Sequence, residues 1–186
     1  MMPNFIDPAR ESTLSELNEK LSEDPTVDAL VTIDTSHHEI HEGEMFSYTE
    51  VNDLSNGAIR NILIVTAAKQ DHLFITITSE SECGFKFYEA ATASNNGTGV
   101  SDYNRNRPLA ATLAPVTLLF HTPTVAGGAE GTLLFSTHWG SGKGVGGQGR
   151  TYEEWILKPS TKYLLRITNE TASANQVAID LQWYEE

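Results

Sequence analysis

Cysteine and long apolar runs are scarce in this chain of 186 residues. Cys83 is the only cysteine, which excludes an intrachain disulfide and favours a protein made in the cytosol. No stretch approaches the roughly 20 apolar residues that cross a bilayer, so we expect no membrane partner. Residues 1–8 also lack the basic start and apolar centre of a secretory signal.

Basic residues are few, above all near the N-terminus. The chain has 12 Lys and Arg against 25 Asp and Glu, which gives a net charge of -13. Residues 1–53 contain 13 acidic residues but only Arg10 and Lys20 as bases, so this segment alone carries -11. Because such a chain repels phosphate, nucleic acid is not an expected partner. We expect most of these acids to keep a surface segment solvated.

Motifs for nucleotide binding and nucleophilic catalysis are missing. Gly142-Lys143 is followed by Gly144, where a phosphate-binding loop needs Ser or Thr. The chain has no Gly-x-Ser-x-Gly elbow, and acidic neighbours are expected to blunt the reactivity of Cys83. We therefore expect no catalytic residue, no cofactor and no enzymatic activity.

A histidine-rich run at residues 37–42 is the one candidate metal site. On a strand, His37, Glu39 and His41 would share a face that could hold a borderline metal ion. The spacing does not match a zinc-protease motif. We expect an exposed strand without a metal here, and a metal-dependent jelly-roll enzyme is the third functional alternative.

Residues 1–35 form an acidic arm with its own pattern. Thr13 and Glu16 fit a capping box at the start of a helix, and Pro25 ends that helix. A helix this short needs support from elsewhere, either from its own domain or from a neighbouring subunit. Its apolar stripe consists of Leu14, Leu17 and Leu21.

Residues 36–186 follow a period of two, which predicts strands. Leu73, Ile75 and Ile77 alternate with Phe74, Thr76 and Thr78, and similar alternation recurs along the chain. Eight to ten short strands without separating helices predict a mainly β fold, an antiparallel β-sandwich or jelly roll. The shared faces include Val116, Leu118 and Phe120; Leu133, Phe135 and Thr137; Tyr163, Leu165 and Ile167; and Val177, Ile179, Leu181 and Trp183.

A glycine-rich loop covers residues 139–151. Its glycines permit close approach of another backbone. Trp139, Lys143 and Arg150 frame the loop with an aromatic ring and two cations, residue types that favour protein contacts. A flexible linker is the alternative interpretation.

Three segments resemble the head decoration, or capsid cement, proteins of tailed bacteriophages. They are the His-rich opening at residues 36–46, the glycine loop with its Gly146-Gly147-Gln148 run, and the ending at residues 180–186. The resemblance covers about residues 36–186. It implies a β-sandwich or jelly roll, commonly a homotrimer. It further implies attachment to the major capsid protein on the virion exterior, with several contacts adding up to tight retention.

Under this hypothesis two groups of residues would bind partners. The arm would dock on a neighbour through Phe5, Ile6, Leu14, Leu17 and Leu21. Trp139, Lys143 and Arg150 would contact the shell or another protomer. The alternative is a carbohydrate- or receptor-binding module that uses Trp139, Trp155 and Trp183 for stacking. Trp183 argues against it, because this residue lies on the apolar face of its strand and is expected in the core.

Overall fold

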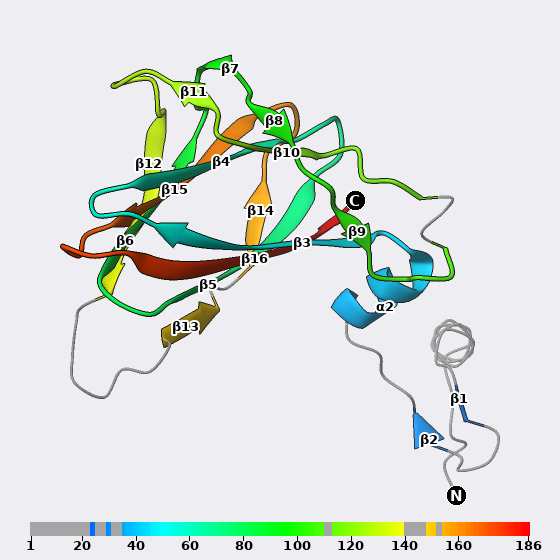
Figure 1. Ribbon diagram of the computed structural model, residues 1–186. Helices are drawn as coiled ribbons and strands as arrows, with labels where there is room; N and C mark the ends of the chain where they lie inside the picture. The colour runs from blue at the N-terminus through cyan, green and yellow to red at the C-terminus, as the bar shows by residue number, and fades with distance from the viewer. Residues whose placement is uncertain (1–22, 25–28, 31–34, 110–112, 140–147, 152–153) are drawn as a thin grey trace, which may run out of the picture. The chain divides into compact units, whose positions relative to one another are not determined.

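The computed structural model describes residues 23–24, 29–30, 35–109, 113–139, 148–151 and 154–186 (Figure 1). The chain divides into two compact units, residues 1–38 and 39–186. In the first unit, β1 (Glu23–Asp24) pairs antiparallel with β2 (Ala29–Leu30). The helix predicted from Thr13 onward lies outside the described residues.

The helix α2 (Thr35–Glu42) replaces the strand that the sequence predicted at the histidine-rich run. Its C-terminal end explains the difference. Gly43 has a φ of +80°, its N–H donates to the Ile40 carbonyl at 3.2 Å, and the Glu44 N–H donates to the Glu39 carbonyl at 2.9 Å. This pair of bonds is a Schellman cap, which ends a helix at a glycine. The strand prediction for residues 37–42 is therefore wrong.

The second unit is an antiparallel β-sandwich, as predicted, with two main sheets and a small two-stranded sheet (Figure 1). The first sheet has the order β13-β5-β16-β3-β9, with β14 also on β5, and the second has the order β12-β6-β15-β4-β10-β8. The first sheet contains β3 (Met45–Leu54), β5 (Asp71–Ser79), β9 (Tyr103–Asn104), β13 (Gln148–Thr151), β14 (Trp155–Leu157) and β16 (Asn175–Glu185). The second contains β4 (Ile59–Val65), β6 (Cys83–Glu89), β8 (Thr98–Gly99), β10 (Leu118–His121), β12 (Thr132–Trp139) and β15 (Lys162–Asn169). The two-stranded sheet pairs β7 (Ala93–Asn95) with β11 (Thr124–Val125).

The long strands pair from the outside of the sequence inward. β3 pairs with β16, β4 with β15, β5 with β13, and β6 with β12. Most strands that follow each other directly, such as β3 and β4 or β15 and β16, belong to different sheets, whereas β13 and β14 both pair with β5. The chain therefore crosses repeatedly between the two layers and builds one shared core.

The core forms from the faces that the period of two predicted. β5 alternates between buried and half-buried residues along its whole length. Apolar side chains of β5, β6, β15 and β16 point between the sheets, and each stabilises the fold by about 1.5–3 kcal/mol relative to an exposed position. At 0–1% exposure these residues are Leu73, Ile75, Ile77, Phe85, Phe87, Tyr163, Leu165, Ile167, Val177, Ile179, Leu181 and Trp183.

Two predicted faces differ from the structure. Val116 and Leu118 are about half exposed, at 49% and 50%, whereas Leu119 between Leu118 and Phe120 is buried. The strand is shorter than predicted, and its core-facing position is Leu119. In β12, a register shift between Leu133 and Phe135 leaves Leu133 50% exposed while Phe135 packs against the core. A bulge of this kind changes the face on which the following residues lie.

Candidate functional site: the β9 edge

Residues 98–109 and 113–118, named here the β9 edge, close one side of the sandwich. β8 is the outermost strand of the second sheet, and β9 is the outermost strand of the first. The segment therefore passes from one sheet edge to the other. β12 and β13, which flank the glycine loop, form the outermost strands on the opposite side.

Asn104 fixes the local structure of this edge. It is 5% exposed, and its side-chain Nδ2 donates to the carbonyls of Gly43 at 2.6 Å and Leu113 at 3.4 Å. Its Oδ1 accepts from the Asn106 N–H at 2.8 Å. One buried amide thus ties β9 to the segment at Leu113 and to the residue that follows α2.

The entry of the chain into the second unit lies against the same edge. The Asn106 side chain donates to the His41 carbonyl at 2.9 Å, and the Arg105 N–H donates to the Met45 carbonyl at 2.9 Å. A Cβ on Gly43 would lie 2.7 Å from a Leu113 methyl carbon. The positive φ of Gly43 disfavours any side chain at this position, and Leu113 would also have to shift to admit one.

Two buried acids anchor the other end of the edge. Glu185 accepts from the Val116 N–H at 3.0 Å and from the Thr117 N–H at 2.9 Å. Asp71, its partner across the strands, accepts from the Thr117 hydroxyl at 2.7 Å. Both acids are at most 3% exposed. The end of β16 therefore holds residues 116 and 117 through their backbone.

Burial and the neighbouring Glu185 disfavour the charged form of Asp71. Burial raises the pKa of Asp71 to about 6, the hydrogen bond from Thr117 lowers it in part, and the Glu185 carboxylate raises it further. The Asp71 Oδ1 atom is buried without a hydrogen-bond partner. Burial, and then Glu185, also raise the pKa of Asp102. The interior side of the β9 edge is therefore rich in negative charge.

Exposed apolar side chains gather on the β9 edge. Five of the nine large apolar residues that the described chain exposes lie here: Tyr103 at 59%, Leu109 at 37%, Leu113 at 39%, Val116 at 49% and Leu118 at 50%. Isolated exposed apolar residues are ordinary on a soluble protein, but a concentration of them along one edge of the fold is a candidate contact surface. Arg105 and Arg107 add cations to the same segment.

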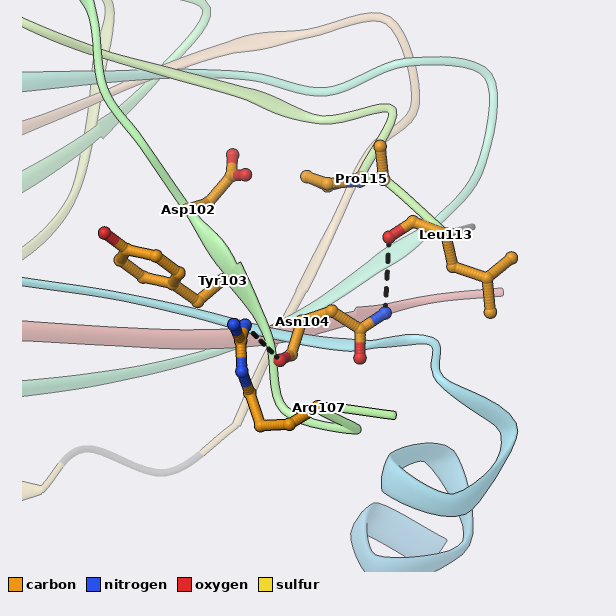
Figure 2. Close-up of a pocket in the computed structure, with 7 residues that line it drawn as sticks. Asp102, Tyr103, Asn104, Arg107, Leu113 and Pro115 are labelled. Carbon is orange, nitrogen blue, oxygen red and sulfur yellow. Dashed lines mark hydrogen bonds between the residues drawn. The ribbon is translucent and has the colours of Figure 1, made fainter. Parts of the chain in front are cut away.

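A pocket of about 260 Å³ lies in this edge, between β9 and the segment at residues 113–115 (Figure 2). In the figure, Asp102 and Pro115 lie at its upper end, Asn104 spans its base toward Leu113, and Arg107 lies below. The Arg107 guanidinium also lies 5.7 Å from the centre of the Tyr103 ring. The pocket thus combines one carboxylate, one guanidinium and apolar walls.

The residues predicted to bind partners lie mostly outside the described part of the chain. Phe5, Ile6, Leu14, Leu17, Leu21 and Lys143 fall there, and so do the side chains of Trp139 and Arg150. The backbones of Trp139 and Arg150 pair with Cys83 and Ile77 respectively. The partner-binding roles of all eight residues therefore stay predictions.

The predicted histidine face and tryptophan platform change in the structure. On α2, residues two apart lie on different faces, so His37, Glu39 and His41 do not line up as they would on a strand. No group of three or more His, Cys, Asp or Glu among the described residues is arranged to hold a metal ion.

Trp183 is 1% exposed, as expected of a core residue, and Trp155 packs edge-on against Phe87.

Cys83 is fully buried. Burial is the main cause that raises the pKa of its thiol to about 11, and the Glu170 carboxylate raises it further. The acid that contributes is thus Glu170, which is distant in sequence, and not one of the acidic sequence neighbours. In the part of the chain that is described, no helix combines the length and apolar character needed to cross a membrane.

The sequence pattern does not predict the β9 edge, because the two-residue strands β8 and β9 leave no periodicity. The available signals were the asparagines at 104 and 106, since Asn readily bonds nearby backbone groups in turns. No model of a known protein family matches the chain, and no curated protein matches it either.

Proposed function

We propose that this chain is a non-enzymatic decoration protein that binds the outside of a tailed-phage head. In this proposal it is made in the host cytoplasm, binds the major capsid protein and stabilises contacts between neighbouring shell subunits. The observation that carries the proposal is the concentration of exposed apolar side chains on the β9 edge. Apolar and aromatic groups with nearby arginines are the composition typical of protein interfaces.

The strand order supports the choice of architecture. The first long strand pairs with the last, the second pairs with the second last, and the pattern continues inward. This order supports the expected jelly roll. Jelly rolls are common in viral capsid proteins and in lectins. A jelly-roll fold is therefore compatible with a virion protein. The function itself depends on the residues exposed at the surface of that fold.

The positions of the two contact regions support a homotrimer. The chain enters the second unit beside the β9 edge, while the strands that flank the glycine loop form the opposite side of the sandwich. Contact between two different sides of identical subunits is heterologous, and such contacts close into rings when the rotation allows. Linked protomers would then hold the shell through several modest contacts at once.

A charge placed on the edge tests the proposal. Leu118→Asp introduces a carboxylate at a half-exposed position of the β9 edge, and Ile156→Asp does so at a 58% exposed position on β14. We expect L118D to lose trimerisation and retention on gradient-purified heads, whereas I156D retains both. Sedimentation velocity and quantitative mass spectrometry of the particles measure the two properties. Equal retention of both variants would contradict an interface at the β9 edge.

A further inference from the structure

The pocket in the β9 edge has a lining of mixed charge. Asp102 supplies a half-buried carboxylate and Arg107 a guanidinium, and both line the same cavity of about 260 Å³. The Asn104 side chain is already bonded to Gly43, Leu113 and Asn106, and one N–H of Arg107 donates to the Asn104 carbonyl at 3.4 Å. The Asp102 carboxylate, the other N–H groups of Arg107 and the Tyr103 hydroxyl are therefore the polar groups of this lining that are placed to select a ligand.

Mixed charge disfavours charged ligands of either sign. An anion that approaches Arg107 also meets Asp102, with Glu185 behind it, and a cation that approaches Asp102 meets Arg107. A neutral hydroxyl avoids both penalties, because it donates to the carboxylate with its hydrogen and accepts from the guanidinium with its oxygen. A ligand with several adjacent hydroxyls fits this requirement best.

The rest of the lining provides apolar contact. Leu113, Ala114 and Pro115 form one wall, and Tyr103 contributes a ring that is 59% exposed. A sugar ring presents hydroxyls around its rim and C–H groups on its faces, and it therefore uses both kinds of surface. The cavity is below the roughly 300–1,000 Å³ of drug-sized sites, which limits it to about one ring.

We infer that the pocket between β9 and residues 113–115 binds a single neutral hexose unit, with Asp102 and Arg107 sharing its hydroxyls and Tyr103, Leu113 and Pro115 contacting its C–H faces. The inference goes beyond attachment to a shell and does not depend on it, although the pocket can bind a sugar only where no neighbouring subunit covers the β9 edge. It also replaces the tryptophan platform considered in the sequence, since Trp155 and Trp183 pack in the core. An open pocket of this size implies weak binding, with a Kd of about 1–10 mM.

Amide-resolved NMR titration of the full chain tests the site. The probes are glucose, galactose and N-acetylglucosamine, with galacturonate and galactosamine as charged rings of similar size. We expect saturable shifts for at least one neutral sugar, centred on residues 102–107 and 113–114, and weaker binding of both charged sugars. The inference is overturned if no neutral sugar saturates at about 50 mM, or if the shifts lie elsewhere.

Charge-changing variants give the sharper result. Asp102→Asn removes the group that repels anions, so galacturonate binding should improve by roughly threefold to fivefold. Arg107→Met removes the group that repels cations, so galactosamine binding should improve similarly. Asp53→Asn, at an exposed position on β3, is the matched control and should change nothing. Unaltered selectivity between neutral and charged sugars in folded D102N and R107M variants would refute the inference.

Discussion

Asp71 is a buried carboxylate whose ionisation opposes folding. Its pKa is raised from 3.8 to about 6, chiefly by burial, so the folded state binds its proton more tightly than the unfolded state does. The cost is therefore present above pH 6, and it is relieved as the pH falls from 6 toward 4. From this shift we place the cost near pH 7 at about 3 kcal/mol.

Asp71→Asn should remove that cost and keep an oxygen for the Thr117 hydroxyl. We predict that the variant is more stable than the parent by about 1–3 kcal/mol at pH 7–8 and that the difference vanishes near pH 4. Urea unfolding at several pH values between 4 and 8 measures this difference. A stability difference that does not change with pH would show that the ionisation of Asp71 does not cause it. Asp53→Asn, at an exposed position, is the control.

Glu50 differs from Asp71 because its carboxylate is paired with a cation, the guanidinium of Arg60. Arg60 of β4 binds the Glu50 carboxylate of β3 through Nε at 2.8 Å and through a second, very short contact. The Tyr48 hydroxyl donates to the same carboxylate at 2.6 Å. Burial would raise the pKa of Glu50, but the hydrogen bonds from Arg60 and Tyr48 outweigh it and lower the pKa. The pair joins the two sheets.

Arg60→Met should destabilise the fold because it leaves a mostly buried carboxylate without its cation. We predict a loss of about 3–5 kcal/mol at pH 7, most of which the double variant R60M/E50L recovers. The surface pair Lys158–Glu89 is the comparison, and Lys158→Met should cost less than about 1 kcal/mol. Chemical unfolding of the four proteins decides the point. Equal losses for R60M and K158M would contradict the role given to the inter-sheet pair.

At the scale of elements, the junction between α2 and β3 depends on one glycine. Gly43 has φ +80° and lies against Leu113, whereas Gly57 has φ +67° and would meet nothing within 4 Å. Ala at either position is strained by about 1–2 kcal/mol. Gly43→Ala adds a clash with Leu113, so we predict a total loss of about 2–4 kcal/mol. Thermal and urea unfolding compare the stability of the Gly43→Ala and Gly57→Ala variants. Equal losses of stability would mean that the Leu113 side chain moves aside at no cost in free energy.

The elements that sequence predicted well are those with one buried face. In β5 and β16, alternate side chains are fully buried, so periodicity alone identified Leu73, Ile75 and Trp183 as core residues. The same rule failed at β12, where a bulge leaves Leu133 exposed, and at β10, where only Leu119 faces the core. Local irregularities of pairing leave no trace in the pattern of residue types.

The candidate site was beyond sequence reasoning for a different reason. The β9 edge is held by Asn104 to Gly43, 61 positions away, and by Glu185 to Thr117, 68 positions away. Such bonds exist only after the sheets have assembled. The α2 helix was missed although its glycine cap is local, because the alternating His37-to-His41 run favoured a strand in our interpretation.

At the scale of the whole molecule, the division at residue 38 makes a prediction about the arm. The β-sandwich carries its own core, so a chain that lacks residues 1–35 should still unfold cooperatively. Loss of the acidic arm should weaken binding to the partner shell by removing one of several linked contacts. Circular dichroism and head-binding assays measure the two effects. Loss of folding would show that the arm belongs to the core.

We propose that the whole molecule works by joining surfaces of an assembled shell. The most direct test is the copy number of the protein per shell subunit in gradient-purified heads, measured by quantitative mass spectrometry. We predict a fixed ratio that is reproduced between preparations and matches three copies at each site of the shell lattice. A protein that is absent from the heads, or present only in variable traces, would contradict the account.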